Sequence, residues 1–124
     1  MSYFIAALIG LLAGLHTCTW GMYKDAPHEG FTWPKYFRSA VVGTVLGASA
    51  HYFTQWDLGD AGNRFVYWGL IYCLERAATE FWKYFIREED QSKYFIPMQF
   101  AVFGRVVDSQ ARRLAIGAVM TAAV

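Results

Sequence analysis

The stretch Arg64–Arg87, RFVYWGLIYCLERAATEFWKYFIR, decides how the rest of the chain is interpreted. It begins as an unbroken apolar run from Phe65 to Leu74. The part that follows contains charged residues, namely Glu75, Arg76, Glu80, Lys83 and Arg87. The last four are spaced four, three and four residues apart, so on a helix they share one face with alternating sign, while Glu75 points elsewhere. Such a helix lies half in apolar and half in polar surroundings, or crosses a bilayer with its charges turned toward protein.

The composition indicates an all-α integral membrane protein with a single domain over residues 1–124. Hydrophobic residues make up 56% of the chain and charged residues 17%, against about 25% charged in ordinary soluble proteins. Aromatic residues reach 19%, which suits the two interfaces of a bilayer. The alternative is a soluble helical subunit whose apolar faces are covered by partners.

Charge and cysteine content exclude other classes. The net charge is +1 and the basic residues are scattered, so no nucleic-acid footprint is present. Cys18 and Cys73 both lie in apolar stretches, which is typical of small buried residues and not of a disulfide framework. No motif for a metal site or for nucleophilic catalysis is found.

The first predicted transmembrane helix covers residues 2–23, which contain no formally charged residue and are long enough to cross a bilayer of about 30 Å. A signal peptide is disfavoured because a basic leading region and a convincing cleavage site are lacking. Small side chains recur every fourth position, as Ala6, Gly10, Gly14 and Cys18. Such a stripe lets another helix approach closely.

The second predicted helix covers residues 39–56 and carries a matching stripe of Ser39, Gly43, Gly47 and His51. The two stripes together predict a tight antiparallel pair. Between the two helices, residues 24–37 are expected to form a basic, aromatic loop, because Pro27, Gly30 and Pro34 break helices.

The third predicted helix covers residues 64–86, and two further apolar segments, 94–104 and 114–124, are too short to span. We expect these two segments to be interfacial or re-entrant, or to lie on a partner. The first loop is basic, the second (57–63) is acidic, and the region after the third helix is basic. The positive-inside rule therefore places the N-terminus outside and the C-terminal third inside, in a bacterial or an organelle inner membrane.

Two groups of residues are candidates for chemistry. The first is the charge cluster Glu75, Arg76, Glu80 and Lys83, which is either a polar site near mid-membrane or a set of surface or inter-subunit salt bridges. The second is His16 and His51, each of which could ligate a haem or pigment alone, although antiparallel helices put them at opposite ends of the pair.

These features predict a small accessory or structural subunit of a larger membrane complex, such as a respiratory or photosynthetic one, with other membrane subunits and lipids as partners. No cofactor is required, although a bound lipid or pigment is compatible with the sequence, and no catalytic residue is expected. One alternative is a small membrane enzyme acting on a lipid or isoprenoid, with Lys35 and Arg38 at the headgroup. The other is a haem- or pigment-carrying subunit.

Overall fold

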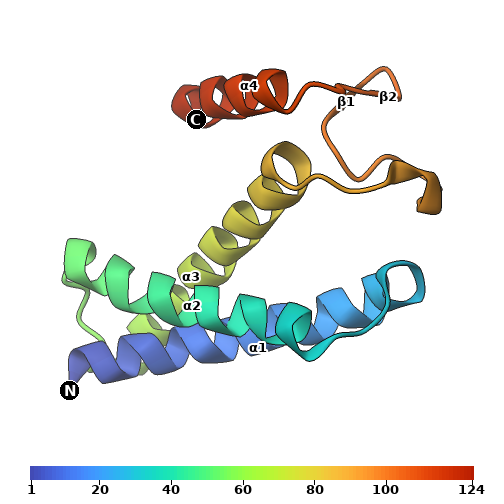
Figure 1. The fold of residues 1–124 in the computed structure, drawn as a ribbon. Coiled ribbons are helices and arrows are strands. Elements are labelled where there is room, and N and C mark those ends of the chain that lie inside the picture. The colour runs from blue at the N-terminus through green and yellow to red at the C-terminus, as the bar shows by residue number, and fades with distance from the viewer. The chain divides into compact units, whose positions relative to one another are not determined.

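The computed structural model describes residues 1–124 and is mostly helical, in agreement with the predicted all-α class (Figure 1). The α-helices are α1 (Ser2–Glu29), α2 (Trp33–Thr54), α3 (Ala61–Phe81) and α4 (Gln110–Ala123). The shorter elements are a π-helical turn η1 (Trp82–Ile86), a 3-10 turn η2 (Gln91–Lys93), and the strands β1 (Ala101–Val102) and β2 (Arg105–Val106). The strands pair as a minimal antiparallel hairpin. The chain forms two compact units, Met1–Ala77 and Ala78–Val124, where the sequence predicts a single domain.

The predicted loop over residues 24–37 is wrong, because helix occupies most of it. Helix α1 continues through Pro27 to Glu29, and α2 begins at Trp33 with Pro34 in its first turn. Pro34 is favourable there because the first N–H groups of a helix have no intrahelical partner. Pro27 removes only one intrahelical hydrogen bond. The connection is therefore confined to residues 30–32, with Gly30 at a φ of 72° that glycine adopts without strain.

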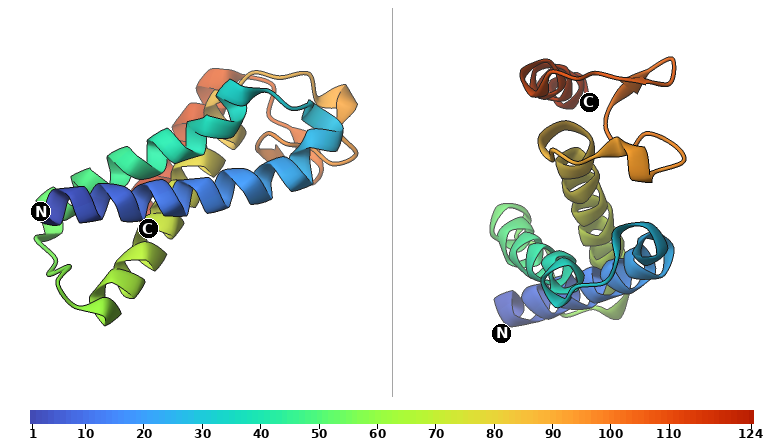
Figure 2. Two further views of the ribbon diagram at one scale, coloured as in Figure 1. Left: turned by 90° about the horizontal axis from the view of Figure 1, so that it is seen from below. Right: turned by 45° about the vertical axis from the view of Figure 1, so that its right-hand side comes forward.

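In the first unit α1 and α2 lie side by side and antiparallel (Figures 1 and 2). The first part of α3 completes the core, which consists of Ala6, Ile9, Ala13, Leu58, Tyr67 and Ile71. Tyr67 ties α3 to α2, since its hydroxyl donates to the Gly47 carbonyl oxygen at 2.5 Å. This core is small, and two of its six residues are alanines.

The start of α3 is fixed by side chains of the preceding turn. The Asp60 carboxylate accepts from the Gly62 backbone N–H at 2.6 Å, as an N-terminal capping residue does. Arg64 folds back and donates from Nε to the Leu58 carbonyl at 2.7 Å and from Nη2 to the Gly59 carbonyl at 2.9 Å. The acidic turn 57–63 is therefore an ordered connection.

The second unit is built on the π-helical turn and on α4. The Gln99 side chain donates to the Arg87 carbonyl at 2.6 Å, and Gln110 donates to the Ile86 carbonyl at 2.9 Å. These amides satisfy carbonyl groups at the end of the helix. The predicted segment 94–104 contains no helix and leads into the hairpin, whereas 114–124 falls almost wholly inside the longer helix α4.

By length and composition, one helix of the structure, α1, is suited to crossing a membrane. Helix α2 contains hydroxyl, histidine and tyrosine side chains among its apolar residues, and α3 contains Glu75, Arg76 and Glu80. These residues lower the mean hydropathy of both helices. The coarse prediction of an N-terminal helix able to cross a membrane is thus supported, and neither α2 nor α3 meets the same criterion of length and composition.

Candidate functional site

The two predicted stripes of small residues meet along the contact between α1 and α2. A Cβ placed on Gly10 would lie 2.1 Å from the Gly43 carbonyl oxygen and 3.2 Å from the Cα of Gly47. A Cβ on Gly14 would lie 2.2 Å from the Ser39 carbonyl oxygen. Real Cβ atoms do not approach so closely, so the backbones touch only because these positions lack a side chain.

The ends of the two stripes are buried as well. Ala6 is fully buried and Cys18 is 4% exposed. The Cys18 Sγ lies 3.2 Å from the Leu15 carbonyl within its own helix, and no disulfide is present. Cys73 is exposed, contrary to the prediction that both cysteines are buried. Its place on α3 lies away from the buried side chains of that helix.

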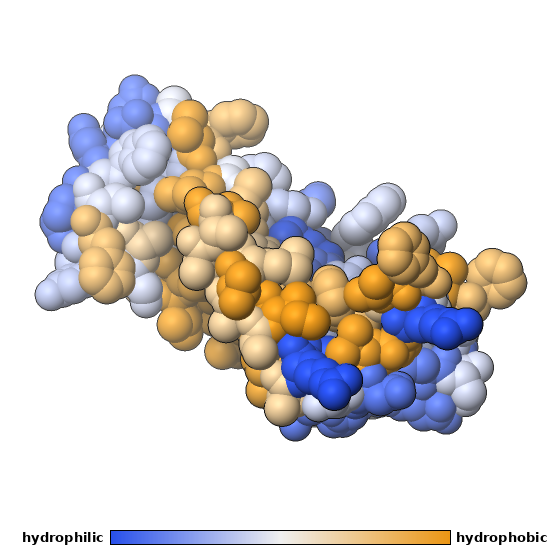
Figure 3. Space-filling model, turned by 90° about the horizontal axis from the view of Figure 1, so that it is seen from above, coloured by the Kyte–Doolittle hydropathy of each residue, from blue (hydrophilic) through white to orange (hydrophobic).

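Large apolar side chains of the helical pair face outward instead of inward. On α1 the exposed residues include Phe4, Leu8 and Leu12, four positions apart, and on α2 they include Phe37, Val41 and Val45 at the same spacing. Hydrophobic side chains at the surface also appear as orange atoms in Figure 3. This distribution is the reverse of a soluble helical hairpin, in which large apolar residues fill the contact.

The predicted charge cluster is partly buried. Glu75 is fully buried, and Lys83 is 7% exposed. Together with Tyr67, Ile71 and Thr79 these residues form a buried row at every fourth position of the helical segment. Arg76 and Glu80 are half-buried beside that row. None of the four charged side chains is without a partner, as buried ionisable groups require.

The two histidines lie far apart along the helical pair. His16 is exposed, with its ring centroid 5.5 Å from that of Tyr72 and 6.0 Å from that of Trp68. His51 is 4% exposed and packs edge-on against Tyr3 at 4.8 Å. Since thirteen residues of α1 separate Tyr3 from His16, about 20 Å of helix lies between the two sites. Each histidine therefore packs in its own aromatic environment.

The second unit holds a polar cluster that is not among the site residues predicted from the sequence. Arg113 is 1% exposed, and its guanidinium donates to the carbonyls of Val107 at 2.5 Å and Asp108 at 3.0 Å and to the Glu88 carboxylate. It therefore fixes the segment that precedes α4. The signal that could have found it is the single arginine turned toward the apolar side of an amphipathic helix.

Glu89 lies in a second ion-pair group beside this cluster. Its carboxylate pairs with Arg87 at 2.8 Å and with Lys93 one turn later. Burial raises the pKa of Glu89, but the Lys93 hydrogen bond and the Arg87 charge oppose this effect and hold the pKa below its ordinary value. The ionised form is therefore the one that the fold stabilises.

The comparisons give no relative from which a function could be transferred. No protein-family model matches the chain, and neither a curated protein nor a solved structure matches it. In the structure no three or more His, Cys, Asp or Glu side chains come close enough together to hold a metal ion. The function is therefore argued from the packing and the surface alone.

Proposed function

We propose that this protein is a small integral membrane subunit that contributes helix packing and contacts to a larger membrane complex. The observation that carries the proposal is the reversed packing of α1 and α2. Glycine and alanine form their contact, while large apolar side chains such as Leu12 and Val45 face outward. In a bilayer, close packing of small residues replaces the hydrophobic effect as the force that pairs helices, and lipid or a partner covers the outer faces.

In this proposal α1 and α2 cross the membrane as an antiparallel hairpin, and α3 forms a third span. The full burial of Glu75 within the chain is compatible with a membrane-spanning α3, because ionisable groups at membrane depth are tolerated only beside polar partners. The charges of the loops favour an orientation with the N-terminus outside and the C-terminal third inside. An energy-transducing complex is the kind of assembly that we favour.

Two measurements test the proposal in sequence. The first is alkaline carbonate extraction of membranes that contain the tagged full chain, for which we expect the protein to stay in the membrane pellet. Release into the supernatant would refute membrane integration. The second is purification in a mild detergent with mass spectrometry of the co-purifying proteins, for which we expect a stoichiometric set of larger membrane subunits.

A matched pair of variants makes the second measurement specific. Glu80→Gln removes one charge of α3, whereas Asp108→Asn removes one from an exposed position before α4. We expect Glu80→Gln to reduce the yield of partner subunits and Asp108→Asn to leave it unchanged. A chain that is membrane-integrated but purifies alone, or only with itself, would refute the subunit role.

A further inference from the structure

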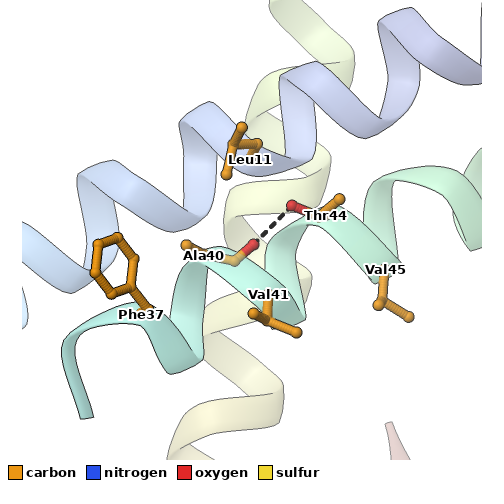
Figure 4. A pocket seen from close by; sticks show the side chains of 6 residues that line it. All are labelled: Leu11, Phe37, Ala40, Val41, Thr44 and Val45. Carbon is orange, nitrogen blue, oxygen red and sulfur yellow. Dashed lines mark hydrogen bonds between the residues drawn. The ribbon is translucent and has the colours of Figure 1, made fainter. Parts of the chain in front are cut away.

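An apolar groove of about 360 Å³ runs along the outer side of the α1–α2 pair (Figure 4). It is lined by Leu11 of α1 and by Phe37, Ala40, Val41, Thr44 and Val45 of α2. The one hydroxyl in this lining, that of Thr44, donates to the Ala40 carbonyl at 2.8 Å and is satisfied within its own helix. The groove therefore offers only hydrocarbon surface to an occupant.

The dimensions of the groove suit an extended hydrocarbon chain. From Phe37 to Val45 the helix rises about 12 Å. Ala40, which is 3% exposed, forms the bottom of the groove, and Gly14 lets α1 approach α2 closely there. The larger side chains of Leu11, Phe37, Val41 and Val45 complete its lining. A flexible acyl chain can follow such a path, whereas a rigid polar ligand finds no hydrogen-bonding partner there.

A cation without an internal partner lies at one end of the groove. Arg38 directly follows Phe37 and shares a helix face with Val41 and Val45, three and seven positions later. The structure gives its guanidinium no hydrogen bond or ion pair, and its Nε is buried without an acceptor. Because helical side chains lean toward the N-terminus of their helix, we expect the Arg38 guanidinium to extend toward the connection between the two helices.

The neighbouring cation differs in that it is already paired. Lys35 donates to the Glu29 carbonyl oxygen at 3.2 Å and lies 3.9 Å from the Glu29 carboxylate. The same end of the pair carries an aromatic cluster, in which Trp33 lies 5.0 Å from Phe31 and 5.8 Å from Phe37 between ring centroids. Tryptophan and basic residues gather at headgroup depth, so this end matches the headgroup level of a bilayer.

We propose that the groove binds an anionic phospholipid, with one acyl chain along Val41 and Val45 and the phosphate at Arg38. This inference rests on the proposed membrane location and adds a ligand to it. The phosphate accepts from the guanidinium, for which the chain itself supplies no partner, and a planar guanidinium matches phosphate geometry. The apolar groove and the unpaired cation together favour a molecule that carries both a hydrocarbon chain and a phosphate.

Native mass spectrometry of the full chain in mild detergent tests the proposal. The probes are phosphatidylglycerol and diacylglycerol with identical acyl chains, of which only the first carries a phosphate. We expect phosphatidylglycerol to be retained at least about tenfold more tightly, because the difference is about one charge-assisted hydrogen bond. Arg38→Gln should remove this preference, whereas the control Lys35→Gln, which changes the cation that is already paired, should keep it.

A second variant tests the apolar part of the site. Val41→Trp places a large side chain over the groove from an exposed position outside the glycine contact, and it should lower retention of both lipids. Far-UV circular dichroism must show the same unfolding for the variants as for the parent chain. Equal retention of the two lipids by the parent chain, or an unchanged preference in Arg38→Gln, would overturn the proposal.

Inorganic phosphate distinguishes a free anion from a lipid headgroup. If millimolar phosphate displaces phosphatidylglycerol, the site is a simple anion site and the proposal fails. If phosphate has no effect, the acyl chain is required, as proposed. The outcome is separable from that of the proposed function, because a chain that stays in the carbonate-washed membrane but does not discriminate between the lipids refutes this inference alone.

Discussion

Replacing Gly10 by alanine is the sharpest test of the helical pair. The added methyl carbon would lie 2.1 Å from the Gly43 carbonyl oxygen, and 2.8 Å from its carbonyl carbon. Since both atoms belong to backbone, neither can rotate away, and the two helices must separate by about 1 Å to reach a tolerable contact. A gap of that size forfeits a quarter to a half of the dispersion energy of the contacts that it opens.

Overpacking of this kind costs about 1–3 kcal/mol, and it is opposed by the gain in helix propensity when alanine replaces glycine. Gly21 provides the matched control, because it lies on the same helix and a Cβ there would meet nothing within 4 Å. Both variants gain the same propensity, so the difference between them isolates the packing term. We therefore expect Gly10→Ala to be about 1–3 kcal/mol less stable than Gly21→Ala.

The assay is reversible unfolding of the purified chain in mixed micelles, in which dodecyl sulfate is titrated and helix content is followed by far-UV circular dichroism. Gly43→Ala should behave like Gly10→Ala, since its Cβ would lie 2.4 Å from the Gly10 carbonyl oxygen. If Gly10→Ala and Gly21→Ala unfold with the same free energy to within about 0.5 kcal/mol, the backbone contact does not hold the pair together.

Three further perturbations test other parts of the chain. Tyr67→Phe removes the hydrogen bond to the Gly47 carbonyl and should cost about 0.5–1.5 kcal/mol in the same unfolding assay. The pKa of Glu89 is lower in the folded chain than its ordinary value, so its contribution to stability is present above that value and is lost as the pH falls through the folded-state pKa. Glu89→Gln should therefore flatten the pH dependence of the unfolding free energy in acid, and an unchanged profile would contradict this assignment. Phe103 has a φ of 49° at a fully exposed position before Gly104, so Phe103→Asn should stabilise the second unit by about 1 kcal/mol in thermal unfolding, and a loss of stability would show that the phenyl ring has a packing role.

Local sequence patterns predicted the helices well where the pattern repeats over several turns. The four-residue spacing of Gly10 and Gly14 on one helix and of Gly43 and Gly47 on the next indicates which faces meet, because a stripe of small residues has meaning only against another backbone. Proline was a weaker guide. Pro27 lies in the last turn of α1, although a proline removes one intrahelical hydrogen bond and its ring crowds the preceding turn.

The site residues could be predicted only in part, because their environment depends on contacts between distant segments. The helical period puts Glu75 on a different face from Arg76, yet nothing in the sequence indicates that the Glu75 face is the buried one. Lys83 was grouped with the half-buried charges and is itself buried. Arg113 was not singled out, because the carbonyls that it binds lie in an irregular segment whose path the sequence does not define.

In the pair of α1 and α2, the atoms that hold the two helices together are not the side chains that face the surroundings. The two helices contact each other through main-chain atoms, which every sequence possesses. This contact requires only that a few positions carry no side chain. The outward residues, such as Leu8 and Val45, can therefore be exchanged without altering how the two helices meet. A surface of this kind can diversify to fit new neighbours or new lipids while the scaffold beneath it stays the same.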